Sequence, residues 1–367
     1  MRPRPVPSVL DLAPVIHGGL NYGELSARGL SPQDVLDFSV SVNPMPPHVA
    51  VLKAAREADT SRYPDRSCGA LRAALSDLTG VDPSSILVTN GASQAIWLTA
   101  SVFLCPGRKT AIVSPAYGEY AQASVVRGAV VELWNARSVM MDQASLPAFF
   151  GKKMTKEVPD LLWICSPNNP TGYVMDRDQV EALLNVVREA PTLIVVDEAY
   201  RNFLAAPSDL TPLLASGQLL LLRSMTKDYG LPGVRLGYVL GASDAVAAME
   251  TVQPDWSVSA QAQAVGLALL RHGDHYRAQW AELRCERARL VRELMDRGVT
   301  VCPGEANFIL CRHPESARLI ENLRDRGIML RDCRSFGLDG WFRIGVKARE
   351  DNERLLAEID RFLNREE

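Results

Sequence analysis

The feature that most constrains the fold is the alternation of short apolar runs with amphipathic stretches between residues 86 and 240. Continuous apolar runs bounded by polar turns are typical of strands that are buried on both faces of a parallel sheet. The intervening stretches, such as residues 176–188, have helical spacing, so we predict an α/β fold with a mostly parallel sheet. The predicted strands are Ile86–Val88, Ala111–Val113, Leu161–Cys165, Leu193–Val196, Leu219–Leu222 and Leu236–Leu240.

The two ends of the chain differ from this central region. Residues 1–48 are rich in Pro and Gly and lack a sustained helical pattern, which predicts an N-terminal arm. After Pro254, a long helical region at 260–297 precedes two strand-like pieces and a final helix. We therefore predict an arm at 1–48, a large domain at 49–250 and a smaller α+β domain at 251–367.

Composition excludes several classes of protein. The formal net charge is −3, which argues against a nucleic-acid-binding surface. The aliphatic runs are far shorter than the roughly 20 residues that a membrane-spanning helix needs, and the first residues contain no apolar signal core. The seven Cys are scattered without a CxxC pair, and His272 and His275 lack further ligands nearby. We expect a cytoplasmic protein with free thiols and no metal site.

Polar residues follow the predicted strands at the edge where ligands bind in open α/β sheets. Gly91, Ala92 and Ser93 open a helix after the first strand and suit a phosphate or form a plain turn. Later strand ends are followed by the aromatic residue Tyr117, the amide Asn169, the acid Asp197 and the amine Lys227. Each residue alone also fits a structural role. Together they match pyridoxal phosphate (PLP), an aldehyde with a phosphate and a flat pyridine ring.

Three motifs then resemble the fold-type I, class I/II aminotransferases. They are SPNNPTG at Ser166–Gly172, DEAY at Asp197–Tyr200 and SMTKDYGLPGVRLGY at Ser224–Tyr238. The resemblance covers nearly the whole chain. It implies an aspartate aminotransferase-like fold, with a large PLP-binding domain and a mostly parallel mixed sheet, and PLP as the cofactor.

Within that family, other segments are similar to the branch of histidinol-phosphate aminotransferase and threonine-phosphate decarboxylase. The segments include His17-Gly18-Gly19, Asn43-Pro44, Arg62-Tyr63-Pro64 and Trp256-Ser257-Val258. The first and the last of these segments are more similar to the decarboxylase. However, Leu20 and Ser259 stand where the decarboxylase usually has Asn, so an aminotransferase is our leading interpretation.

The resemblance also implies a role for each site residue. Lys227 forms a Schiff base with the cofactor and moves the α-proton, Asp197 keeps the pyridine nitrogen protonated, and Tyr117 stacks on the ring. Asn169 and Tyr200 bond the ring hydroxyl oxygen. The cofactor phosphate is held by Gly91, Ala92, Ser93, Ser224, Arg235 and the partner subunit's Tyr63, which implies a homodimer.

Four residues are expected to bind an amino-acid substrate. By resemblance, Arg343 clamps the α-carboxylate, and Arg331 meets a distal phosphate. His17 and Asn43 are expected near the same pocket. Two alternatives stay open: threonine-phosphate decarboxylation, and a non-catalytic ligand sensor built on the same fold. A nicotinamide enzyme is disfavoured because no GxGxxG joins a strand to a helix.

Overall fold

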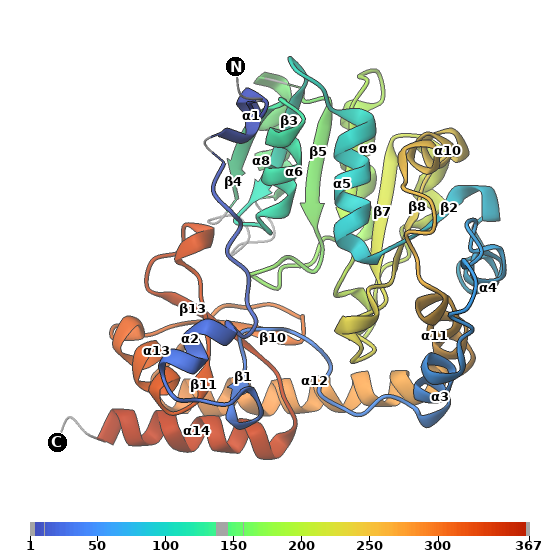
Figure 1. Ribbon diagram of the computed structural model, residues 1–367. Helices are drawn as coiled ribbons and strands as arrows, with labels where there is room; N and C mark the ends of the chain where they lie inside the picture. Colours follow the sequence, from blue (N-terminus) through green and yellow to red (C-terminus); the bar gives the residue numbers. More distant parts are fainter. Residues whose placement is uncertain (1–3, 11, 137–145, 157, 365–367) are drawn as a thin grey trace.

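The computed structural model describes residues 4–10, 12–136, 146–156 and 158–364, and its largest element is a seven-stranded sheet (Figure 1). The strand order is β2-β8-β7-β6-β5-β3-β4, in which β8 is antiparallel to both neighbours and the other pairs are parallel. This confirms the predicted α/β class and the mostly parallel mixed sheet. The strands are β2 (Ile86–Thr89), β3 (Lys109–Ser114), β4 (Val130–Asn135), β5 (Leu161–Cys165), β6 (Leu193–Asp197), β7 (Leu219–Ser224) and β8 (Gly237–Leu240).

Helices cover both faces of this sheet, which explains why its central strands are apolar at successive positions. All residues of β5, β6 and β7 are buried. Alternate residues belong to two different cores: Trp163 packs in the core of α5 (Gly91–Phe103) and α6 (Glu119–Val126), and Ile164 in the core of α9 (Arg177–Val187). Each strand therefore has two buried faces.

Two elements differ from the prediction. The sequence did not indicate β4, an edge strand in which only Trp134 is buried. Because its other side chains are not buried, it lacks the continuous apolar run that marked its neighbours. The helical region at 260–297 is two helices, α11 (Ala260–Arg271) and α12 (Gly273–Asp296), because His272 between them leaves the helical conformation with φ −112° and ψ 30°.

The C-terminal part forms smaller sheets below the large one (Figure 1). A four-stranded antiparallel sheet has the order β12-β13-β10-β9, and helices α12, α13 and α14 flank it. Its elements are β9 (Thr300–Val301), β10 (Phe308–Arg312), α13 (Ser316–Asp325), β12 (Arg331–Asp332), β13 (Trp341–Gly345) and α14 (Arg349–Leu363). Other helices in the described part of the chain include α3 (Val49–Glu57), α4 (Gly69–Thr79), α8 (Leu146–Lys156) and α10 (Ser243–Val252). In the described part of the chain, no helix has the length and apolar character needed to cross a membrane.

The N-terminal segment connects the two parts of the molecule, as Figure 1 shows. Its first helix α1 (Pro7–Leu10) lies against α6, and the Ser8 hydroxyl donates to the Val126 carbonyl at 3.2 Å. Farther along, β1 (Leu36–Asp37) pairs in parallel with β11 (Ile328–Met329) near the small sheet. The chain between these two contacts passes beside the cavity described below.

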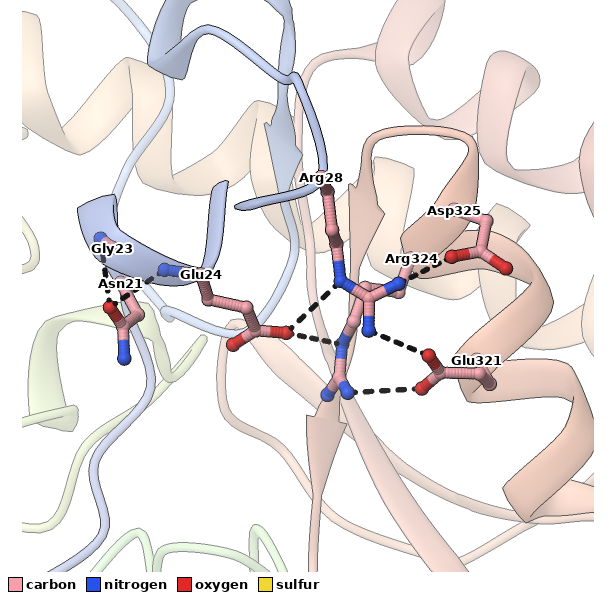
Figure 2. A network of polar contacts seen from close by, with 7 residues as sticks. All are labelled: Asn21, Gly23, Glu24, Arg28, Glu321, Arg324 and Asp325. Carbon is pink, nitrogen blue, oxygen red and sulfur yellow. Dashed lines mark hydrogen bonds and ion pairs between the residues drawn. The ribbon is translucent and has the colours of Figure 1, made fainter. Parts of the chain in front are cut away.

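A charged network anchors the middle of this segment to α13 (Figure 2). Arg28, which follows α2 (Tyr22–Ala27), pairs with Glu24, Glu321 and Asp325. Arg324 joins the same network through Glu24 at 3.5 Å and Glu321 at 3.1 Å. Because these side chains are largely solvated, we assign the network a role in docking the segment rather than in overall stability.

Candidate active site

A cavity of about 510 Å³ lies at the carboxyl edge of the large sheet, between that sheet and the small one. The structure brings eight of the predicted site residues to its wall. They are His17, Tyr117, Asn169, Tyr200, Lys227, Arg235, Arg331 and Arg343. The parallel strands explain the gathering, because their carboxyl ends meet at one edge and the loops that follow them face the same space.

Lys227 lies in the loop after β7 and directs its amine between two aromatic rings. Its Nζ is 4.5 Å from the centre of the Tyr200 ring and 5.9 Å from that of Tyr117. Burial alone would lower the pKa of Lys227, but Tyr200 and the carboxyl of Asp197 outweigh it and raise the pKa above its ordinary value. The amine therefore lies among a carboxyl and two aromatic rings that favour its charged form.

Asp197 is the last residue of β6 and lies beneath the cavity rather than on its wall. Its Oδ2 accepts a hydrogen bond from the Tyr120 hydroxyl at 2.7 Å, and its Oδ1 accepts one from the Ala199 N–H at 2.9 Å. Burial raises the pKa of this carboxyl, while Lys227 and these two donors oppose the rise. The bonds fix its orientation but leave lone pairs for a cationic N–H.

The start of α5 and Arg235 form a cradle with no room for a side chain. Gly91 has φ +74°, and a Cβ there would lie only 2.6 Å from an Nη atom of Arg235. A Cβ on Gly237 would likewise lie 2.8 Å from the Ala92 nitrogen. A helix N-terminus beside a guanidinium suits an anion such as a phosphate. Ser93, in the same turn, is a hydrogen-bond partner of Tyr117.

Two buried arginines face the cavity from the small sheet. Arg331 and Arg343 are directly opposite each other in the β12–β13 pair. The Arg343 Nη2 donates to the Ser39 carbonyl at 2.7 Å, its Nη1 donates to Asn169 Oδ1, and its buried Nε has no partner among the described residues. The Arg331 Nη2 donates to the Ile16 carbonyl at 2.6 Å and to the Ser335 hydroxyl at 2.7 Å.

These contacts leave the two cations close together without a carboxylate bonded to either. Burial and the charge of Arg343 lower the pKa of Arg331. Two buried like charges are costly unless anions join them. The pair is therefore suited to bind an anion.

His17 reaches the cavity from the N-terminal segment. Its Nε2 is 3.0 Å from Glu119 Oε1, and the Trp97 indole N–H donates to Glu119 Oε2 at 2.8 Å. The His17 ring lies 5.5 Å from that of Tyr117. Sequence reasoning missed Glu119 and also Tyr120, the partner of Asp197. Tyr120 is three residues beyond Tyr117 at the start of α6, which is the only sequence signal that pointed to it.

The structure places other predicted residues away from the cavity wall. Asn43 is buried behind the Lys227 loop, with its amide bonded to Asp228 and Gln279, so the expectation that it meets substrate is not what the structure shows. Tyr63 is exposed and stacks on Trp256 at 4.3 Å. Ser224 ends β7, and its hydroxyl is 3.0 Å from that of Thr226.

A second cavity, of about 540 Å³, lies behind β7 but lacks this chemistry. Its wall includes the buried ion pair of Arg223 and Glu198, with Nε and Oε2 2.7 Å apart. Among the predicted site residues, only Ser224 touches it. The cavity that contains Lys227 is therefore the candidate active site.

The cavity fits PLP by its own donor set. It combines an amine, a buried carboxylate, an aromatic ring and an anion cradle too tight for a side chain at Gly91. Among the described residues, no cluster of His, Cys, Asp and Glu could hold a metal ion.

Comparison with known proteins gives the family. The profile of aminotransferase class I and II matches residues 33–359. Threonine-phosphate decarboxylase of Salmonella typhimurium is 34% identical over 351 residues, covering 94% of this chain and 95% of that protein. Histidinol-phosphate aminotransferase of Frankia casuarinae is 31% identical over 360 residues, covering 92% and 89%. The crystal structure of the histidinol-phosphate aminotransferase from Clostridium acetobutylicum has a TM-score of 0.82 at 26% identity, covering 90% of this chain and 100% of that chain.

The chain belongs to the aminotransferase class I and II family. Its relatives confirm the predicted branch, which holds histidinol-phosphate aminotransferase and threonine-phosphate decarboxylase. The assignment also confirms the predicted enzyme class, fold and PLP cofactor, and it favours an enzyme over the non-catalytic sensor.

The neighbour of Lys227 generates a prediction about stability. Burial raises the pKa of Asp228 from 3.8 to about 7 although Asn202 donates to its Oδ2, and its Oδ1 has no partner in the part of the chain that the structure describes. Ionisation of Asp228 therefore destabilises the folded protein, and the free energy of unfolding falls as the pH rises from about 4 through 7. Asp228→Asn should raise the unfolding free energy at pH 8 by as much as about 4 kcal/mol, with little change at pH 4. Chemical denaturation at the two pH values measures this.

Asp82 supplies a control because its pKa shift, and therefore the pH dependence of its effect on stability, has the opposite sign. Hydrogen bonds from Ser84 lower the pKa of Asp82, so Asp82→Asn should reduce stability more at pH 8 than at pH 3. An Asp228→Asn protein that is less stable than the unaltered protein at pH 8 would contradict the assignment.

Proposed function

We propose that this protein is a PLP-dependent aminotransferase for an amino acid or related amine that carries a second anionic group, a phosphate in the simplest case. The observation that carries this proposal is the pair Arg343 and Arg331 on one wall of the Lys227 cavity. One cation suits the carboxylate of an amino acid, and the other suits a distal phosphate.

In this proposal, the chain's own residues hold the cofactor at three points. Gly91 and Arg235 would bind the phosphate, Tyr117 would stack on the ring, and the Asp197 carboxylate would accept the N–H of the pyridinium. Tyr120 and the Ala199 N–H keep that carboxylate in place. Bound PLP supplies an electron sink for the electrons of a bond broken at the substrate α-carbon.

Proton transfer falls to Lys227. The raised pKa of its amine means that the Nζ must lose a proton before it can act as a nucleophile or base. The anionic Asp197 and the Tyr200 ring hold the charged amine at the cavity. Once the amine is neutral, it is placed to take a proton from the substrate α-carbon and to return it one step later.

Substrate orientation falls to the arginines. Arg343 is fixed by Ser39 and Asn169, so its unpartnered Nε and the rest of its planar fork are preorganised for a carboxylate. The Arg331 Nη2 is bonded to the Ile16 carbonyl, which is a neutral acceptor that an anionic group would outcompete.

The second candidate reaction is decarboxylation of threonine phosphate. It is favoured by the 34% identity to a protein named threonine-phosphate decarboxylase. Against it, Leu20 and Ser259 differ from the decarboxylase pattern. Ser259 has a structural task here, because its hydroxyl caps α11 by accepting the Ala262 N–H at 3.1 Å.

One experiment separates the reactions. The purified protein with PLP is incubated with histidinol phosphate and 2-oxoglutarate, and separately with threonine phosphate and no keto acid. We expect glutamate to form in the first mixture and no catalytic release of CO₂ in the second. Lys227→Ala should abolish both turnover and the visible absorption band of the lysine-bound cofactor. Sustained CO₂ release by the unaltered protein would replace transamination with decarboxylation.

The substrate class can be tested through Arg331. Arg331→Ala should lower kcat/KM for a phosphorylated substrate about 10²-fold, since a charge-assisted contact contributes about 1.5–3 kcal/mol. The value for an unphosphorylated amino acid should change little. Arg334→Ala is the matched control, because Arg334 is exposed and pairs with Asp332 outside the cavity. Equal losses on both substrates would refute the phosphate role.

We further propose that the protein is a cytoplasmic homodimer with shared active sites. All seven cysteines are free thiols, which supports a reducing compartment. Tyr63 is 77% exposed and stacks on the half-exposed Trp256 instead of entering the cavity of its own chain. An exposed aromatic pair supports an interface with a second copy.

Mixed dimers test that proposal. Tyr63→Ala and Lys227→Ala chains should each have low activity alone. After subunit exchange, one site of each hybrid has both residues, so roughly a quarter of the wild-type activity should return. Light scattering measures the oligomeric state in parallel. Dimers that exchange subunits without recovering activity would contradict a role for Tyr63 across the interface.

A further inference from the structure

The loop that carries Lys227 is held from behind by Asn43. The backbone N–H of Asn43 donates to the Lys227 carbonyl at 2.7 Å, and its side-chain Nδ2 donates to the Asp228 carbonyl at 3.0 Å. Gly230, in the same loop, comes so close that a Cβ would lie 3.1 Å from the carbonyl oxygens of Asn43 and Met45. The backbone that directly follows the Lys227 side chain is therefore tied to one buried residue.

Asn43 is in turn oriented by Gln279 on the long helix α12. The second hydrogen on Asn43 Nδ2 goes to Gln279 Oε1 at 2.8 Å. The Asn43 Oδ1 accepts the Met45 N–H at 3.0 Å, and Gln279 Nε2 donates to the Pro46 carbonyl at 2.9 Å. Because a backbone N–H only donates and a carbonyl only accepts, these contacts fix the direction of both amides.

The fixed direction of the Gln279 amide determines the protonation state of His275, the last residue of these linked hydrogen bonds. Gln279 Nε2 also lies 3.1 Å from the Nε2 of His275. Since that Gln279 atom is a donor, His275 Nε2 must accept, so its ring is neutral with the proton on Nδ1. A protonated His275 would present an N–H to an N–H and break the contact.

His275 is exposed and belongs to a cluster of aromatic rings. Its ring lies 5.1 Å from those of His48 and Tyr276, and His48 stacks on His272 at 4.0 Å. Burial, with His272 and His275, lowers the pKa of His48. Along α12, the charges of Asp274 and Arg277 pair with each other.

We propose that Asn43 and Gln279 are positioning residues that hold Lys227 for its reaction, and that their relay is intact only when His275 is neutral. This inference rests on the proposed function, because the role of Lys227 as the cofactor-binding amine comes from it. The relay touches neither Arg343 nor Arg331. It acts on the lysine backbone, and a displacement of about 1 Å at a reacting group can cost about 10²-fold in rate.

The pH profile of the PLP-bound protein tests the histidine. His275→Gln supplies an acceptor that does not titrate, at an exposed position that tolerates change. His272→Gln is the matched control, since His272 belongs to the same cluster but has no bond to Gln279. We expect kcat of the unaltered protein and of His272→Gln to fall about tenfold between pH 7.5 and 5.5, where imidazoles ionise. The fall should be much smaller in His275→Gln. If kcat of His275→Gln fell between pH 7.5 and 5.5 as much as kcat of the unaltered protein, the proposal would be overturned.

Asn43→Asp tests the relay itself, because it replaces the Nδ2 group, which donates two hydrogen bonds, with one oxygen that faces the Asp228 and Gln279 carbonyl oxygens. We expect kcat to fall about 10²-fold and KM for the amino donor to stay within about threefold. The unloaded variant should also acquire the visible lysine–cofactor band more slowly when PLP is added. A kcat within threefold of wild type would overturn the proposal. Should this variant not fold, the His275→Gln profile decides alone.

The same spectra separate this inference from the proposed function. If the unaltered protein never develops the band, the assignment of Lys227 fails. If the band forms normally in every variant and the profiles coincide, only the relay is refuted.

Discussion

The burial of the central sheet on both faces is the constraint on which the rest of the structure depends. Strands such as β5, β6 and β7 have no solvated face, so their side chains are almost entirely apolar. Polar chemistry is thereby confined to the strand ends and the loops that follow them. Asp197 and Lys227 lie together because the ends of β6 and β7 are neighbours in the sheet.

The site is also an electrostatic arrangement that the net charge of −3 conceals. Lys227, Arg235, Arg331 and Arg343 face one cavity, and the carboxylate of Asp197 lies beneath it. Such a concentration of cations destabilises the unliganded fold unless anions enter. Arg331 and Arg343 are bonded to neutral carbonyls and an amide, and the phosphate of the cofactor, together with the anionic substrate proposed above, would compensate these charges.

The sequence could predict local features, namely the strands and the residues that directly follow them. All six apolar runs became strands, and residues next to them, such as Tyr117, Asn169 and Tyr200, reached the cavity. Contacts between distant segments could not be predicted. Glu119 binds His17 from another element, and Asn43 bonds the lysine loop on one side and Gln279 of α12 on the other. A short buried Asn has the same sequence signature whether its amide meets a ligand or a backbone carbonyl.

Transamination and decarboxylation break different bonds at the same α-carbon, so the outcome depends on how the substrate carboxylate is held. Arg343 is fixed in a buried strand and bonded to Asn169 and to the Ser39 carbonyl. A carboxylate bound by this guanidinium would be oriented by the small sheet, and Lys227, beside the Tyr200 ring, would be placed to receive a proton from the α-carbon. The same grip suits either reaction, so the selection falls to the remaining contacts of the substrate.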